Sequence, residues 1–174
     1  MKVVIQRVKS SKVEVKNKII GQIDHGILVL IGIAANDDKT DVEWISNKVL
    51  NLRIFDDENG IMNKSLIDEE GDILVISQFT LIASTKKGNR PSYINSAGHE
   101  IAIPLYEYFI KICEDKLGRK VSSGEFGADM KVSLINDGPV TIVIDSKAKD
   151  WFYIIFASSS RSILKFSLTD FFIL

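Results

Sequence analysis

Cysteine and histidine are both scarce in this chain of 174 residues. The single cysteine, Cys113, cannot form a disulfide within the chain, which favours a reducing compartment and makes the cytoplasm the expected location. The two histidines, His25 and His99, lie far apart in sequence, and no cysteine and histidine cluster has zinc-site spacing. These two absences argue against a disulfide-stabilised scaffold and against a structural zinc site.

Long apolar segments and an excess of one charge are missing too. No segment approaches the roughly 18 uninterrupted apolar residues of a membrane span, so no membrane association is expected. The formal net charge is -1, whereas proteins that coat long stretches of nucleic acid are usually strongly basic. Wide contact with phosphates is therefore not expected, although a small contact with a nucleic-acid end stays open.

The common short motifs of nucleotide and ester chemistry are absent as well. The chain has no GxxxxGK[ST] phosphate loop, no GxGxxG after a strand and no GxSxG nucleophile elbow. The segment GEFG (124–127) is interpreted as a loop, in preference to a phosphate site. The chemistry must therefore be sought in other segments.

The apolar pattern predicts a mixed α/β domain. Alternating or continuous apolar runs predict strands at 2–8, 12–15, 19–23, 26–34, 71–84, 130–135 and 140–145. One helix is predicted after ANDDKTD, with an inner face of Val42, Ile45, Val49 and Leu52. A second is predicted from 97 to 117, ended by Gly118, with an inner face of Ile101, Leu105, Tyr108 and Ile112. This order predicts a mixed β-sheet or partial barrel with two covering helices.

The segment SQFTL (77–81) places polar residues within an apolar strand run. A buried polar group without a partner costs about 1–3 kcal/mol, so these side chains need a reason to be there. In a regular strand Ser77 and Phe79 would face one side, and Gln78 and Thr80 the other. Hydrogen bonding to a neighbouring backbone and a functional site are both consistent with this pattern.

The segment LINDGPVTIVID (134–145) interrupts two strand-like runs with Asn136, Asp137, Gly138 and Pro139. Asn, Asp and Gly are ordinary turn residues, but a proline removes a backbone donor where a sheet is expected. Composition alone leaves open whether this is only a corner or a site.

Several segments together resemble the D-aminoacyl-tRNA deacylases. They are MKVVIQRV at the start, SQFTL, KKGNRPSY (86–93) and GEFGADMKVSLINDGPVT (124–141), in the family's order. The resemblance implies a deacylase domain over 1–146. It leaves 147–174, with its two apolar runs, as a C-terminal extension of unknown role.

The resemblance implies a carboxylic ester hydrolase. Its expected reaction is hydrolysis of the ester between a D-amino acid, or mischarged glycine, and the 3′ end of tRNA. Such an enzyme proofreads charged tRNA in translation quality control. The expected assembly is a homodimer with its active site at the subunit interface, and no metal or organic cofactor is expected.

The resemblance also assigns roles to individual residues. It implies that Gln78 and Thr80 serve catalysis and that Ser77 and Phe79 border the substrate. The turn Gly138-Pro139 is expected to be a cis peptide that reaches the partner's active site and leaves no room for an L side chain. Support for this turn is expected from Arg7, Asn136 and Asp137. The basic residues Lys86, Lys87 and Arg90 are candidate tRNA phosphate contacts, and a solvated loop explains them equally well.

Thr80 is expected to position the substrate and not to act as a covalent nucleophile, because no base is evident near it. Two other functions stay open. The fold could be a dimeric module that binds aminoacyl-tRNA 3′ ends without turnover, or an interaction protein whose apolar extension is the working part.

Overall fold

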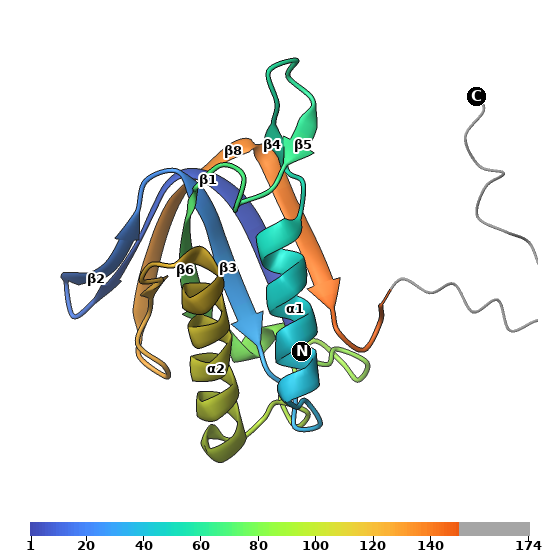
Figure 1. The fold of residues 1–174 in the computed structure, drawn as a ribbon. Coiled ribbons are helices and arrows are strands. Elements are labelled where there is room, and N and C mark those ends of the chain that lie inside the picture. The colour runs from blue at the N-terminus through green and yellow to red at the C-terminus, as the bar shows by residue number, and fades with distance from the viewer. Residues whose placement is uncertain (150–174) are drawn as a thin grey trace, which may run out of the picture.

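Two long helices pack on a strongly curved sheet in the computed structural model, which describes residues 1–149 (Figure 1). The elements in chain order are β1 (Lys2–Val15), β2 (Lys18–Ile23), β3 (Gly26–Gly32), α1 (Lys39–Asn51), β4 (Phe55–Asp56), β5 (Met62–Lys64), β6 (Asp72–Ser77), the 3₁₀ helix η1 (Phe79–Ile82), α2 (His99–Leu117), β7 (Ser122–Ser123) and β8 (Met130–Asp145). The predicted extension lies outside the described residues except for 147–149.

Six strands form one mixed sheet that curls into a nearly closed barrel. The strand order is β2-β1-β3-β6-β7, and β8 pairs with β1 on the edge opposite β3. β6 runs parallel to β3 and β7, while β1 is antiparallel to its neighbours. The two ends of this order meet where the Ser122 hydroxyl donates to the Gln22 carbonyl at 3.0 Å. The predicted mixed sheet or partial barrel is confirmed.

β1 and β8 are each one continuous strand, which corrects the prediction of two shorter strands at either end of the domain. The polar stretch around Ser11 breaks the apolar alternation, yet Ser11 pairs with Ile23 on one side and Leu134 on the other. Backbone hydrogen bonds to both neighbours maintain the strand here, and the apolar pattern alone does not report them.

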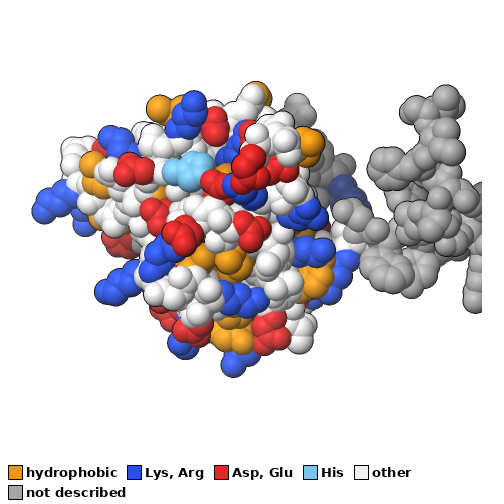
Figure 2. Space-filling model, turned by 45° about the horizontal axis from the view of Figure 1, so that its top comes forward, with side chains coloured by type: hydrophobic (Ala, Val, Ile, Leu, Met, Phe, Trp, Pro, Cys, Tyr) orange, Lys and Arg blue, Asp and Glu red, His pale blue; other side chains and the backbone are white. Residues whose placement is uncertain are grey.

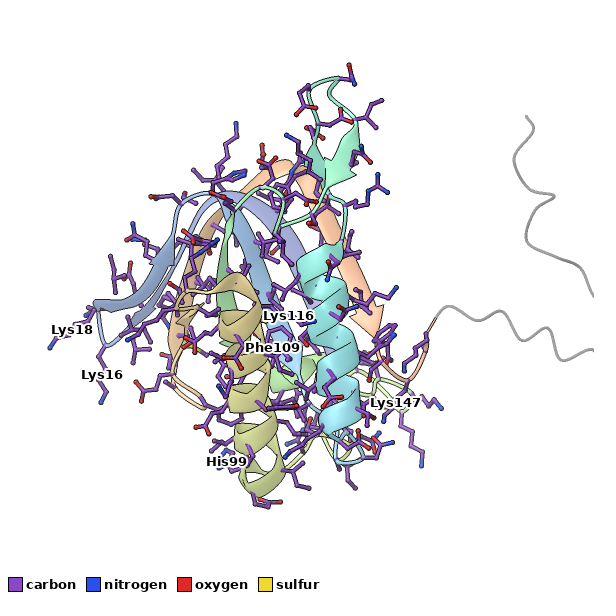
Figure 3. All side chains as sticks on the ribbon, in the orientation of Figure 1. Lys16, Lys18, His99, Phe109, Lys116 and Lys147 are labelled. Carbon is purple, nitrogen blue, oxygen red and sulfur yellow. The ribbon has the colours of Figure 1, made fainter. Side chains whose placement is uncertain are left out.

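The sheet packs apolar side chains on both faces. One core lies between the sheet and the helices and includes Val3, Ile5, Val29, Val75, Ile45 and Phe109. A second, smaller core forms on the barrel side from Val8, Val13, Ile23, Leu28, Leu74 and Ile76. Phe109 is fully buried, and Figure 3 places it on the side of α2 that faces the neighbouring elements.

α1 begins with a capping box. The Asp38 carboxylate accepts from the backbone of Thr40 and Asp41, and the Asp41 carboxylate accepts from the Asp38 amide at 3.0 Å. Three backbone donors at the helix start are satisfied in this way. The predicted inner face is confirmed for Val42, Ile45 and Val49, while Leu52 is the half-buried residue that ends the helix.

The inner face of α2 differs from the prediction. The buried residues are Ala102, Leu105, Tyr106, Phe109 and Cys113, so Leu105 is the one predicted residue that is buried. The helix is apolar over much of its circumference, and two registers of the pattern therefore fitted almost equally well. Gly118 does end the helix, in a left-handed conformation with φ of 66°.

Candidate active site

The strand that carries SQFTL ends within that segment. β6 stops at Ser77, where the Gln78 amide makes a last bond to the Ile31 carbonyl at 2.7 Å, and η1 begins at Phe79. The neighbouring strand β3 ends at Gly32, so no partner continues the ladder. The predicted alternation of faces is therefore wrong beyond Ser77, because the backbone turns there.

The junction between β6 and η1 forms one wall of a pocket of about 630 Å³. Ser77, Gln78 and Phe79 line that wall. The other lining residues come from the end of β3, the loop before α2, the start of α2, the loop before β8 and β8 itself, and include Ile33, Ser96, Ala102, Phe126, Met130 and Val132. Apolar surface with a few polar groups is typical of a small-molecule site.

Aromatic rings and a helix end form the rim of the pocket. Phe79 is 57% exposed, and its ring meets Tyr93 edge-on with centroids 5.0 Å apart. His99 is the first residue of α2 and contacts the ring of Phe126, with centroids 5.7 Å apart; Figure 3 shows it at the end of the helix. The site therefore combines an accessible ring with an apolar interior.

Gln78 and Thr80 contact each other. The Gln78 side-chain amide donates to the Thr80 hydroxyl. Gln78 lines the pocket, while Thr80 is exposed in the first turn of η1. An amide is no base, so this contact orients the hydroxyl without activating it as a nucleophile.

Lys86, Lys87 and Arg90 are exposed on a loop beside the pocket. The loop is closed at its base by two backbone bonds between Ser84 and Ser92, of 2.8 and 2.9 Å. Tyr93, the residue that follows, packs against Phe79. The three cations are thus joined to the pocket wall through the base of their loop.

The turn 136–139 interrupts the pairing of β8 with β1. The peptide Gly138-Pro139 is cis, and Gly138 has a φ of +134°, which L side chains rarely adopt. A Cβ on Gly138 would lie 2.7 Å from Cγ2 of Val140 and 3.3 Å from the Arg7 guanidinium. Gly138 and Pro139 are both exposed.

Arg7 connects the turn to the body of the protein. Its Nε donates to the Asp137 carbonyl at 3.1 Å, and its Nη1 donates to the Ile54 carbonyl at 2.7 Å. Its guanidinium also lies 3.6 Å from the Asp137 carboxylate and 3.4 Å from that of Asp56. Arg7 is only 7% exposed, so these partners neutralise a buried charge.

The pocket and the turn are separate within one chain. Among the described residues, β8 reaches the pocket through Met130 and Val132, and neither Gly138 nor Pro139 lines it. The structure therefore brings Ser77, Gln78 and Phe79 together in one place and the turn with Arg7, Asn136 and Asp137 in another.

Charges of both signs are interspersed on the face seen in Figure 2, without a large area of one sign. Within residues 1–149, no three His, Cys, Asp or Glu side chains are grouped closely enough to hold a metal ion. The described helices include none with the length and hydropathy of a membrane span.

A family model described as D-Tyr-tRNA(Tyr) deacylase matches residues 4–145. The chain belongs to this family. A D-aminoacyl-tRNA deacylase of Flavobacterium psychrophilum is 59% identical over 150 residues, which cover 86% of this chain and 100% of that protein. The family resemblance predicted from the sequence is confirmed, and with it the class of enzyme, a deacylase.

Two solved structures share the deacylase fold. One, described as c-Myc DNA Unwinding Element Binding Protein, is 39% identical with a TM-score of 0.78 and covers 83% of this chain and 98% of its own. The other, described as a probable eukaryotic D-amino acid tRNA deacylase, is 18% identical with a TM-score of 0.72 and covers 82% and 97%. The second supports the fold alone.

Part of the pocket lining was not predicted from the sequence. Ser96 and Ala102 come from a loop and a helix that carry no recognisable motif, and His99 is one of two widely separated histidines and belongs to no motif. Phe126 lies in GEFG, for which the sequence predicted only a loop, and the structure places it in the lining of the pocket.

Proposed function

We propose that this protein hydrolyses the ester bond of D-aminoacyl-tRNA, and of glycyl-tRNA, and that it rejects L-aminoacyl-tRNA. The observation that carries the proposal is the pocket of about 630 Å³ whose wall includes Ser77, Gln78 and Phe79. This volume suits one nucleoside with an attached aminoacyl group. Membership of the deacylase family and the names of its curated relatives support the same substrate class.

The terminal adenosine of tRNA fits the apolar part of the pocket. Ile33, Ala102 and Phe126 offer apolar surface to a base, and the accessible ring of Phe79 can pack on it from the rim. Unpaired RNA ends are commonly bound by such stacking. The aminoacyl ester then lies beside Gln78 and Thr80, at the start of η1.

The chemistry is attack of water on the ester carbonyl. The bond between the carbonyl carbon and the ribose oxygen breaks, the ribose oxygen takes up a proton, and the free amino acid leaves. The Gln78 amide and the Thr80 hydroxyl orient the ester and water and stabilise the developing oxyanion. An aminoacyl ester is already activated, so neither a covalent intermediate nor a cofactor is required.

Chirality is selected by the turn of a second subunit. The turn lies outside the pocket of its own chain, so it can meet the substrate only if another copy supplies it. Ile135 and Val143 of β8 are 60% and 69% exposed, as expected for apolar residues that a subunit interface covers. Backbone carbonyls of the Gly138-Pro139 turn would then occupy the space of an L side chain, while a hydrogen atom still fits.

The remaining parts of the proposal concern the RNA and its location. Lys86, Lys87 and Arg90 are exposed and would contact phosphates next to the terminal nucleotide, which is a small contact compatible with a net charge of -1. Charged tRNA is used in translation, so the enzyme is proposed to act in the cytoplasm. The competing function is binding of aminoacyl-tRNA ends without turnover. It would use the same pocket but leave the ester intact.

Incubation with D-Tyr-tRNA, L-Tyr-tRNA and Gly-tRNA separates these functions. Release of tyrosine from the D-substrate and of glycine, with the L-substrate intact, is the expected result. Protection of all three esters from spontaneous hydrolysis would instead identify a binding module. Ala128→Phe tests the pocket itself, because Ala128 is a half-buried loop residue of the lining and a larger side chain there would fill the pocket. This variant should fold but not deacylate.

Mixing two inactive variants tests the contribution of a second subunit. Ala128→Phe blocks the pocket and Gly138→Ala alters the turn, so each homodimer should be inactive. If each site uses both chains, random exchange of subunits should restore about a quarter of the wild-type sites, because half of the dimers are mixed and each has one intact site. No restoration despite subunit exchange would show that each site is built from one chain.

A further inference from the structure

The Gly-Pro turn is an insertion in an otherwise continuous pair of strands. Gln6 of β1 is paired with Thr141 of β8, and Val8 is paired with Asn136. Between these pairs β1 has the single residue Arg7, whereas β8 has residues 137–140. The turn therefore projects from the ladder opposite Arg7, and Asn136 and Thr141 are the residues at which its two arms rejoin the sheet.

Arg7 holds only the first arm of this turn. Its Nε donates to the Asp137 carbonyl at 3.1 Å, on the side that follows Asn136. Gln6 precedes Arg7 in β1, so its side chain lies on the opposite face of the strand. The Gln6 amide donates to the Thr141 hydroxyl at 3.3 Å, which places it at the second arm.

Thr141 and Asn136 connect the two arms to each other. The Thr141 hydroxyl also accepts from the Asn136 side-chain amide at 3.2 Å. The same Asn136 side chain accepts from the Val140 amide at 2.8 Å and donates to the Val140 carbonyl at 3.1 Å. A chain of hydrogen bonds thus runs from Gln6 through Thr141 and Asn136 to the backbone of the second arm.

We propose that Gln6 and Thr141 are positioning residues for the discrimination between D- and L-substrates. The inference rests on the proposed function of the turn, in which its carbonyls fill the space of an L side chain. With Arg7 fixing the first arm and the Gln6–Thr141–Asn136 chain fixing the second, the carbonyls cannot retreat from the substrate. Loss of the second attachment leaves the turn in place but able to yield, which weakens exclusion more than it weakens turnover.

The test uses a matched pair at position 141. Thr141→Val removes the hydroxyl and keeps the shape and the strand preference, whereas Thr141→Ser keeps the hydroxyl. The measured quantity is the ratio of the deacylation rates of D-Tyr-tRNA and L-Tyr-tRNA, with the melting temperature recorded for each variant. Thr141→Val should lower this ratio by about tenfold, mainly through faster L-hydrolysis, and Thr141→Ser should stay near wild type.

Gln6→Leu tests the other end of the chain. It should lower the same ratio, and the double variant Gln6→Leu/Thr141→Val should be no worse than Thr141→Val alone, because both remove one shared contact. A folded Thr141→Val with a wild-type ratio would overturn the inference. Equal decreases of the ratio in Thr141→Val and Thr141→Ser would also overturn it, because they would assign the effect to packing. Additive decreases in the double variant would show that Gln6 does not act through Thr141.

Gly138→Ala distinguishes failure of this inference from failure of the proposed function. If Gly138→Ala disrupts D-hydrolysis or discrimination while Thr141→Val changes neither, only the roles of Gln6 and Thr141 are wrong. If Gly138→Ala also leaves both unchanged, the turn does not act on the substrate at all.

Discussion

The two segments proposed to meet the substrate are held in place in different ways. Ser77 is the last residue of β6, Gln78 and Phe79 follow it directly, and the Gln78 backbone amide is bonded to the Ile31 carbonyl of β3. The turn at Gly138 projects from β8, and the contacts at its arms come from side chains, those of Arg7, Asn136 and Gln6. Main-chain bonds in the sheet survive most substitutions, whereas an attachment made by side chains does not.

This difference predicts that single substitutions of supporting side chains disturb the turn more than they disturb the pocket wall. Replacement of Gly138 or of Arg7 should lower activity, whereas loss of the Gln6 and Thr141 contacts should lower selectivity more than activity. Replacement of a polar side chain on the wall should slow the reaction but leave the backbone that shapes the pocket unchanged.

The largest effect is expected for Gly138→Ala. A Cβ would lie 2.7 Å from Val140 Cγ2, at a φ of +134°, so the turn must move. A displacement of about 1 Å at a site can reduce a rate by about 100-fold, and a loss of this order in D-Tyr-tRNA hydrolysis is expected in single-turnover kinetics.

Gly60→Ala is the matched control for that variant. Gly60 also has a positive φ, of +74°, but a Cβ there would meet nothing within 4 Å. It should lose some stability and keep wild-type kinetics. Equal losses of activity in both variants would assign the effect to backbone strain in general and not to this turn.

Arg7→Ala should have the next largest effect, on stability and activity alike. It leaves the Ile54 carbonyl without its donor and frees the first arm of the turn. Loss of charged hydrogen bonds at a buried position should lower the free energy of unfolding by about 2–3 kcal/mol, measured by urea denaturation. Lys9 is an exposed residue whose Nζ lies 3.7 Å from the same Asp137 carboxylate, and Lys9→Ala should change the free energy of unfolding by less than about 0.5 kcal/mol.

A smaller effect is expected for Thr80→Ala. The hydroxyl contributes one oriented hydrogen bond, so the rate should fall by about tenfold with turnover still measurable. Thr80→Ser should recover most of it. Detection of an aminoacyl ester on Thr80 by mass spectrometry during wild-type turnover would contradict this role and identify a covalent mechanism.

The smallest effect is expected from the basic loop. Replacement of Lys86, Lys87 and Arg90 by alanine should raise KM for D-Tyr-tRNA and leave kcat unchanged, because the loop is exposed and outside the pocket. For every phosphate that a cation no longer neutralises, the slope of log affinity against log salt should fall by about 0.7. An unchanged salt dependence would mean that the loop is simply solvated.

The sequence was sufficient for those features that local patterns determine. The strand runs, the capping signal before Thr40 and Gly118 at the end of α2 specify the elements, and several separate family-like segments specify the family. The inner face of α2 was assigned wrongly because Ile101 and Ala102 are both apolar, and only packing against the sheet decides between them.

The site was less accessible to sequence reasoning because it depends on where chain segments end in space. The pattern of SQFTL predicts a strand. The strand ends at Ser77 because its neighbour β3 ends at Gly32, which is distant in sequence. Gln6 and Thr141 are ordinary strand residues in the sequence, and their contact requires the register between β1 and β8. Such pairings are properties of the folded sheet and not of either segment alone.

β8 has a further consequence, for solubility. It spans 16 residues and, within the described chain, pairs with β1 alone, so its other edge is open. A long open edge is a template on which strands of other molecules can add and aggregate. Pro139 has no N–H to offer, and Gly138 departs from extended geometry, so the edge is divided into two short halves. The residues proposed to inspect the substrate would thus also keep this enzyme from polymerising along its longest strand.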